Sequence, residues 1–152
     1  MQDLLAPAHV LTGLDCTSRK QLFEVIADCL ASDLELSSHA IVNTLWEREQ
    51  LGTTGMGNGV AIPHGRIGGI SRVYGCLALL DEPLDFGAAD GVPVDLVFAL
   101  LAPAEAGADH LRALAQVSRI LRNPDFCTDC RQARDKDALY RLLINESTAT
   151  AA

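Results

Sequence analysis

Basic residues are scarce in this sequence. It has 12 Lys and Arg against 20 Asp and Glu, which gives a formal net charge of −8. The negatively charged phosphates of nucleic acids bind basic surfaces, so this net negative charge argues against DNA or RNA as a partner. An acidic protein of this size is better suited to a basic patch on another protein. We therefore expect a protein partner and no nucleic acid.

Long apolar runs and a basic leader are also missing. The longest apolar stretch, residues 96–104, is far shorter than the about 20 residues that a membrane-spanning helix needs. The first 15 residues include Asp3 but no lysine or arginine, so they lack the basic start of a signal peptide. Five cysteines is an odd number, which fits free thiols in a reducing compartment better than a disulfide framework. We expect a cytoplasmic protein without membrane insertion.

One cysteine pair has the spacing of a redox or metal motif. Cys127 and Cys130 form a C-x-x-C, but the chain has no second such pair to complete a zinc site. The pair also follows Asn123-Pro124 late in the chain, whereas a thioredoxin-like site follows an early strand. We expect small packing residues on a short helix, with a redox or metal role as the alternative.

The apolar periodicity predicts a single α/β domain. Helices are expected over about 18–31, 38–50 and 109–122, with one or two more over 126–133 and 136–145. Strands are expected over 60–62, 72–80 and 94–101, with a short edge strand and a turn over 84–91. Ser18 and Gln21 have the spacing of a capping box at the first helix. Helices before and after a group of strands indicate an α/β sandwich around a mixed sheet.

A glycine-rich stretch follows the second predicted helix. Consecutive backbone N–H groups at Thr54, Gly55, Gly57 and Gly59 can form a nest for an anion such as a phosphoryl group. A P-loop is excluded because no lysine occurs between positions 20 and 136. The dinucleotide fingerprint is excluded because Val60 stands where its third glycine belongs. The alternative is a flexible loop without a ligand.

A histidine lies just beyond this stretch. His64 follows Pro63, and residues before proline favour extended backbone, so His64 is expected at or just past the end of a strand. A neutral imidazole is a nucleophile near pH 7, and the phosphoramidate that it forms passes the group on readily. Arg48 supplies a planar fork of donors for phosphoryl oxygens. Arg66 is either a second such donor or a solvated surface charge.

The other histidines are weaker candidates. His110 follows Asp109 at the expected start of a helix, where the helix dipole disfavours the imidazolium. The alternative for His110 is a partly buried structural histidine. His9 and His39 have no supporting neighbours, and we expect structural roles for both. His64 and His110 lack HExxH-type spacing and a third ligand, so no metal is expected.

Three blocks of the sequence resemble enzyme IIA domains of the mannitol/fructose class of the bacterial phosphotransferase system. They are REQLGTTGMGNGVAIPHGR at 48–66, DFGAADGVPVDLVFALLAP at 85–103 and HLRALAQVSRILRN at 110–123. They occur in family order, and the similarity runs from about residue 4 to residue 144. We therefore assign residues 1–146 to an EIIA type-2 domain and residues 147–152 to a flexible tail.

The resemblance implies a function as well as a fold. It implies a compact α/β sandwich whose mixed sheet has roughly five strands. It implies a phosphotransferase in which Nε2 of His64 accepts a phosphoryl group from a phosphorylated HPr-type carrier. Arg48 and His110 would support the phosphorylated state. The phosphate would derive from phosphoenolpyruvate through a phosphorelay, without a cofactor.

The subfamily rests on smaller features. Gly-Asn-Gly before Val60, the triplet His64-Gly65-Arg66 and the block at 85–103 resemble nitrogen-type members. Such members are regulators whose phosphorylation state controls binding to transporters or kinases. The alternative is a IIA component that passes phosphate to the IIB domain of a fructose or mannitol permease. A third possibility is a binding module without phosphorylation, against which the presence of Arg48, His64 and His110 argues.

Overall fold

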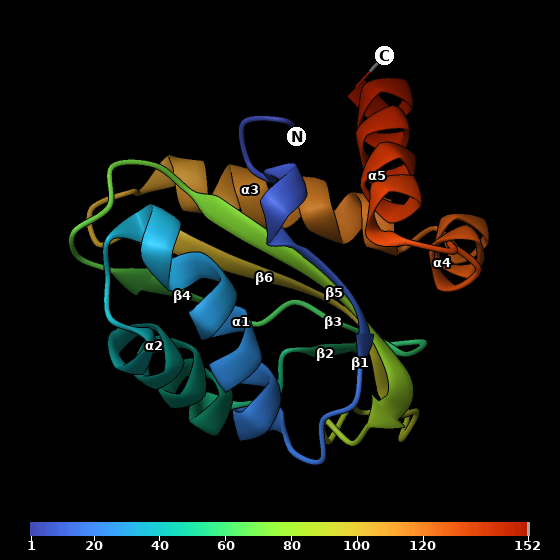
Figure 1. Ribbon diagram of the computed structural model, residues 1–152, viewed down its shortest axis with the longest axis horizontal. Helices are drawn as coiled ribbons and strands as arrows, with labels where there is room; N and C mark the ends of the chain where they lie inside the picture. The colour runs from blue at the N-terminus through green and yellow to red at the C-terminus, as the bar shows by residue number, and fades with distance from the viewer. Residues whose placement is uncertain (152) are drawn as a thin grey trace.

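The computed structural model describes residues 1–151, and a mixed β-sheet runs through its centre (Figure 1). Within that range the sheet has six strands: β1 (Val10–Leu14), β2 (Gly55–Gly57), β3 (Val60–Ala61), β4 (His64–Ile67), β5 (Tyr74–Leu84) and β6 (Val94–Pro103). Their order is β1-β5-β6-β3-β2, and β4 also pairs with β6. β5 and β6 are antiparallel, whereas β3 and β4 run parallel to β6. The predicted mixed sheet is confirmed.

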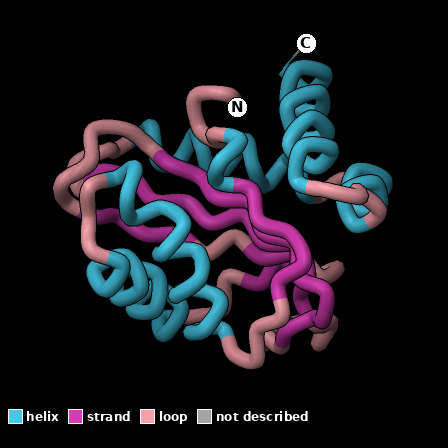
Figure 2. Tube along the Cα trace, viewed as in Figure 1, coloured by secondary structure: helices cyan, strands magenta, loops and turns pink. Residues whose placement is uncertain are grey.

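Helices cover both faces of this sheet (Figure 2). Over residues 1–151 there are five α-helices: α1 (Arg19–Leu34), α2 (Ser38–Leu51), α3 (Ala108–Leu121), α4 (Pro124–Arg131) and α5 (Lys136–Ala151). A short 3-10 helix, η1 (Pro7–His9), precedes β1. Helices α1 and α2 pack on one face, and α3, α4 and α5 pack on the other. The α/β sandwich predicted from the sequence is therefore confirmed.

Strand β6 shows why the sequence there is apolar almost throughout. Successive side chains of a strand point to opposite faces. Val97, Ala99 and Leu101 accordingly join the core beneath α1 and α2. Their neighbours Leu96, Phe98 and Leu100 join the core beneath α3, α4 and α5. A strand buried on both faces needs apolar residues at nearly every position.

The predicted start of α1 is also confirmed. The Ser18 hydroxyl accepts a hydrogen bond from the Gln21 backbone N–H at 3.1 Å. In return, the Gln21 side-chain oxygen accepts from the Thr17 backbone N–H at 2.6 Å. These two bonds satisfy N–H groups that have no partner inside the helix.

No helix within residues 1–151 combines the length and the apolar character that crossing a membrane requires.

Several short elements differ from the sequence-based expectation. The edge strand predicted over 84–91 is wrong, because β5 itself continues to Leu84 and residues 85–93 form a loop. Strands β1, β2 and β4 were not predicted, and His64 begins a strand instead of ending one. These strands have three to five residues, too few for a clear alternation. β1 and β4 form because their long neighbours, β5 and β6, supply hydrogen-bond partners, whereas β2 pairs with the short strand β3.

The end of the chain differs as well. Residues 147–151, expected to belong to a flexible tail, continue helix α5. The Ser147 side chain is buried, and its hydroxyl accepts a hydrogen bond from Gln116 of α3 at 3.3 Å. This contact gives the last turns of α5 a neighbour to pack against. Residue 152, the end of the predicted tail, lies outside the described residues.

Strands β3 and β4 follow one path along β6, interrupted by Ile62 and Pro63. The path is bridged by a hydrogen bond from the Leu100 N–H to the Pro63 carbonyl at 2.9 Å. Helix α2 packs against β4, and Thr44 of α2 lies close to the backbone of Gly65. A Cβ at this position would lie 2.6 Å from Cγ2 of Thr44 and 3.3 Å from the Thr44 carbonyl oxygen. Glycine at position 65 therefore sets the distance between α2 and the strand that begins with His64.

Substitution of Gly65 tests this close approach. We expect Gly65→Ala to lower the free energy of unfolding by about 1–3 kcal/mol, the usual cost of an overpacked site. Adding Thr44→Ser removes Cγ2 and should recover part of the loss. The measurement is urea unfolding followed by circular dichroism.

Gly68→Ala is the matched control. Apart from Gly68 itself and its two chain neighbours, no heavy atom of the described residues lies within 4 Å of the Cβ that this change would add. Gly68→Ala should therefore leave the stability nearly unchanged. Equal stability losses at positions 65 and 68 would show that the contact with Thr44 does not determine the effect.

Candidate functional site

His64 is the first residue of β4, and its ring orientation is set by the backbone two residues earlier. Nδ1 lies 2.8 Å from the carbonyl oxygen of Ile62. A carbonyl oxygen only accepts, so Nδ1 carries the proton and donates this bond. Nε2 is then the nitrogen with the free lone pair. This is the atom that the family resemblance implied as the phosphoryl acceptor.

The surroundings of His64 keep its imidazole neutral. Burial lowers the pKa of His64 below its ordinary value of 6.5, and the nearby Arg48 guanidinium lowers it further. The hydrogen bond to Ile62 and the Glu49 carboxylate act in the opposite direction but are weaker than the burial. At neutral pH the ring is thus uncharged, which is the nucleophilic form.

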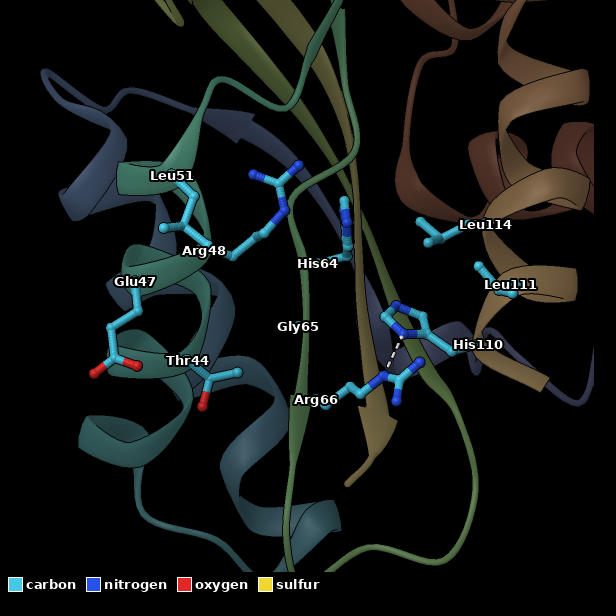
Figure 3. A pocket seen from close by; sticks show the side chains of 10 residues that line it. All are labelled: Thr44, Glu47, Arg48, Leu51, His64, Gly65, Arg66, His110, Leu111 and Leu114. Atoms are coloured by element: carbon cyan, nitrogen blue, oxygen red, sulfur yellow. Dashed lines mark hydrogen bonds between the residues drawn. The ribbon is translucent and has the colours of Figure 1, made fainter. Parts of the chain in front are cut away.

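Arg48 lies in the last turn of α2 and extends toward His64 (Figure 3). Its Nη1 donates a hydrogen bond to the carbonyl oxygen of Gly52 at 2.8 Å. The bond holds the guanidinium beside the end of α2 while its remaining N–H groups stay available. The placement agrees with the predicted role of Arg48 as a donor to phosphoryl oxygens.

His110 lies in the first turn of α3, and tertiary folding brings it next to His64. The two ring centroids are 5.6 Å apart and the rings are inclined by 66°. The side chain of His110 is only 6% exposed. Arg66 donates a hydrogen bond from Nε to Nδ1 of His110 at 3.3 Å. Burial, the neighbouring His64 and the charge of Arg66 lower the pKa of His110 from 6.5, in that order. Arg66 is therefore part of the site and not a remote surface charge.

Two hollows meet at His64. The first has a volume of about 610 Å³ and brings together Arg48, His64, Arg66 and His110, with Leu111 at its edge. The second has a volume of about 440 Å³ and is lined by residues from the glycine-rich stretch and from the end of α3, namely Thr53, Thr54, Gly55, Ser118 and Arg122, among others. Arg48 and His64 line both hollows. A group bound to His64 is thus accessible from two sides.

The four residues of the predicted glycine nest do not lie together at His64 in the structure. Thr54 and Gly55 line the second hollow with His64, whereas Gly57 and Gly59 line neither of the two. Gly59 lies with Asn58 in the two-residue turn between β2 and β3, where both residues have positive φ, 78° and 57°. An Asn-Gly pair with these angles is typical of a type I′ hairpin turn. The hairpin packs against Arg131, whose Nη2 donates to the Asn58 carbonyl at 2.9 Å.

One buried residue of the site was missed from the sequence. The Glu49 carboxylate accepts hydrogen bonds from the backbone N–H of Thr54 at 2.9 Å and from the Thr54 hydroxyl. It also accepts from Nη1 of Arg19 at 3.4 Å. Glu49 thereby connects the last turn of α2 to the loop that lines the second hollow. A signal was present, because Glu49 lies four residues after Leu45 on the apolar stripe of α2, where a charge needs a partner.

The remaining candidates lie away from His64. Cys127 and Cys130 are buried on α4, and burial raises the pKa of the Cys130 thiol to about 12 and raises that of Cys127 as well. Such thiols are poor nucleophiles, so packing accounts for both. Buried His9 pairs with Asp33, and His39 contacts Asn43. The described part of the chain has no group of three or more His, Cys, Asp or Glu arranged to hold a metal ion.

Comparison with known proteins decides the family. Residues 3–146 match the family model described as "Phosphoenolpyruvate-dependent sugar phosphotransferase system, EIIA 2". The chain belongs to this EIIA 2 family. The chain is 46% identical to the nitrogen regulatory protein of Bradyrhizobium diazoefficiens, and the alignment covers 93% of this chain and 92% of that protein. It is 38% identical to the nitrogen regulatory protein of Pseudomonas aeruginosa, with 95% of each chain covered.

Solved structures agree with the assignment of this chain to the EIIA 2 family. The nitrogen regulatory protein IIA-Ntr of Neisseria meningitidis superposes with a TM-score of 0.88 at 33% identity, covering 93% of this chain and 97% of the other. The mannitol IIA of Escherichia coli superposes with a TM-score of 0.76 at 16% identity, covering 91% and 97%. The second likeness is one of fold alone.

Glu49 offers a test of how the site is built. Glu49→Gln keeps the shape of the side chain but removes the charge that Thr54 and Arg19 contact. Hydrogen bonds to a charged group are each worth about 1.5–3 kcal/mol, so we expect a loss of stability of about that size. The measurement is chemical unfolding at neutral pH.

Glu47→Gln is the control for this change. Glu47 lies two residues earlier on the same helix, is exposed and lines the first hollow. Substitution of an exposed carboxylate should change the stability by less than about 0.5 kcal/mol. A similar cost at positions 47 and 49 would contradict the structural role of Glu49.

Proposed function

We propose that this EIIA 2 domain accepts a phosphoryl group on Nε2 of His64 from a phosphorylated HPr-type carrier. It then acts as a nitrogen-regulatory protein whose phosphorylation state controls its binding to target proteins such as transporters or kinases. One observation carries the proposal. The hydrogen bond from Nδ1 of His64 to Ile62 leaves Nε2 as the nucleophilic nitrogen of a neutral ring. That ring lies beside Arg48 and His110.

The residues of the site suit each part of the transfer. The lone pair of His64 Nε2 attacks the phosphorus of the donor's phosphohistidine. The new N–P bond forms as the donor's N–P bond breaks, and the donor imidazole leaves with the electron pair of the broken bond. Charge accumulates on the phosphoryl oxygens during this step, and the catalytic requirement is mainly positioning and electrostatic stabilisation. Arg48 and His110 supply N–H donors for those oxygens, from opposite sides of the first hollow.

The exposed surface around His64 suits a protein donor. Leu51, at the end of α2, is 86% exposed, and Leu111, at the start of α3, is 65% exposed. Both line the first hollow, while the exposed Met56 lines the second. Exposed apolar side chains grouped at one place mark interaction surfaces. An HPr-type donor, which has an apolar docking face with basic residues, matches this surface and the net charge of −8.

The relatives favour regulation over sugar uptake. Nitrogen regulatory proteins from two organisms align with this chain over more than nine-tenths of both lengths. In the proposed function the phosphate derives from phosphoenolpyruvate through the relay, and no cofactor is needed. We place the reaction in the cytoplasm, where the five cysteines, all free thiols within the described residues, remain reduced.

The direct test is phosphorylation in a reconstituted relay. Incubation with phosphoenolpyruvate, an enzyme I-type protein and an HPr-type protein should add one phosphoryl group, detected by intact mass. The adduct should be labile in acid and more stable in alkali, as expected for a phosphoramidate. His64→Gln should remain unlabelled. Full labelling of His64→Gln would place the acceptor elsewhere.

Efficient transfer from the labelled protein to a fructose- or mannitol-type IIB domain would favour the sugar-uptake alternative.

Arg48 provides the second test of the proposal. Arg48→Lys keeps the positive charge but loses the planar fork, so a charge-assisted bond to the phosphoryl group is lost. Such a bond is worth about 1.5–3 kcal/mol, which corresponds to phosphorylation slowed roughly ten- to a hundredfold. The rate is measured by quenched-flow labelling, and the melting temperature should change little.

Arg119→Lys serves as the control, because Arg119 is exposed on α3 and lines neither of the two hollows. It should be labelled at the wild-type rate. Labelling of Arg48→Lys at that same rate would remove Arg48 from the reaction.

A further inference from the structure

The two ring nitrogens of His110 have different surroundings. Nδ1 accepts the hydrogen bond from Nε of Arg66 at 3.3 Å. Nε2 is fully buried and has no hydrogen-bond partner among residues 1–151. Figure 3 shows Nδ1 facing Arg66 while Nε2 is turned to the side of the ring where His64 lies. The imidazole therefore has one satisfied nitrogen and one unsatisfied nitrogen, and the unsatisfied one faces the phosphoryl acceptor.

The contact with Arg66 decides which nitrogen of His110 carries the proton. A guanidinium has five N–H donors, no acceptor and a charge that it never loses in proteins. A nitrogen that receives a bond from it must present a lone pair. Nδ1 of His110 is thus unprotonated, and in the neutral ring the proton is on Nε2. A doubly protonated ring would direct an N–H at Arg66, which agrees with the lowered pKa of His110.

A buried donor without a partner is costly in a folded protein. Leaving such an N–H unsatisfied costs about 1–3 kcal/mol, so its persistence indicates a ligand that satisfies it. The centroid of His64 is 5.6 Å away from that of His110. A phosphoryl group on Nε2 of His64 would bring anionic oxygens, which are strong acceptors, into the first hollow beside this donor.

We propose that Arg66 is a positioning residue that holds His110 in the Nε2–H tautomer, so that this N–H is directed at the phosphoryl group on His64. The proposal rests on the proposed function of His64 as the acceptor. In the opposite tautomer Nδ1–H would face the guanidinium, and the lone pair of Nε2 would face the phosphoryl oxygens. The same side chain would then repel the group that it otherwise stabilises. Arg66 acts through His110, whereas Arg48 acts on the phosphoryl group itself.

The first experiment reads the tautomer directly. Long-range ¹H–¹⁵N NMR of the unphosphorylated protein, at a pH where the ring is neutral, distinguishes a protonated from an unprotonated ring nitrogen. We expect wild-type His110 to be the Nε2–H tautomer. In Arg66→Met the second tautomer should become populated, because the donor to Nδ1 is gone. An unchanged tautomer in folded Arg66→Met would overturn the proposal.

Arg112→Met is the matched control for the NMR experiment. Arg112 lies two residues after His110, and its exposed side chain pairs with Asp109 at 3.0 Å and makes no bond to the imidazole. The variant removes an equal charge close to His110 but leaves the Arg66 contact intact. The tautomer should therefore stay as in the wild type. A tautomer change in both variants would assign the effect to general charge and overturn the specific role of Arg66.

The second experiment separates a positioning role from direct phosphate binding. Arg66→Met should slow phosphorylation roughly tenfold or more in the wild-type background, with the KM for the donor little changed. In the His110→Ala background the same substitution should have almost no further effect, because the residue through which it acts is absent. An equal slowing in both backgrounds would mean that Arg66 contacts the phosphoryl group itself. If wild-type protein is not labelled at all, the proposed function fails, while the NMR result still decides the tautomer.

Discussion

The hydrogen bond from Nδ1 of His64 to the Ile62 carbonyl depends on the break that Pro63 makes between β3 and β4. Pro63 has no N–H, and its carbonyl instead accepts from Leu100 of β6. Ile62 is buried, and its N–H donates to the Thr54 carbonyl at 3.1 Å, while its own carbonyl accepts from the imidazole. The backbone thereby assigns the proton to Nδ1 and the lone pair to Nε2. The proposed transfer of a phosphoryl group to His64 depends on that assignment.

The charges of the site follow from burial and from the arginines. Burial lowers the pKa of both His64 and His110, so neither ring contributes positive charge at neutral pH. The positive charge beside them comes from Arg48 and Arg66, which cannot lose it. This arrangement keeps the imidazole of His64 neutral and still offers charged donors to an anion. It also places a local positive region on a protein whose net charge is −8.

Much of the molecule follows from local sequence. The capping residues Ser18 and Gln21 determine where α1 begins, because the bonds that they make are only three or four residues apart. The continuous apolar run of β6 determines a strand buried on both faces. His64 and Arg48 lie in one block of nineteen residues whose pattern is that of the EIIA 2 family, so both candidates and the family could be predicted before the fold was known.

Other features were decided only by the tertiary structure. Short strands such as β2 and β4 exist because β3 and β6 pair with them, and nothing in their own few residues requires it. The glycine stretch was predicted as one nest, yet the turn at Gly59 folds it into a hairpin, and Gly57 and Gly59 line neither hollow at His64. Arg66 looked like a possible surface charge, and its partner His110 is 44 residues further along the chain. Local pattern determines what a segment can form, whereas proton positions and buried partners, such as those of Glu49, depend on residues that only folding brings together.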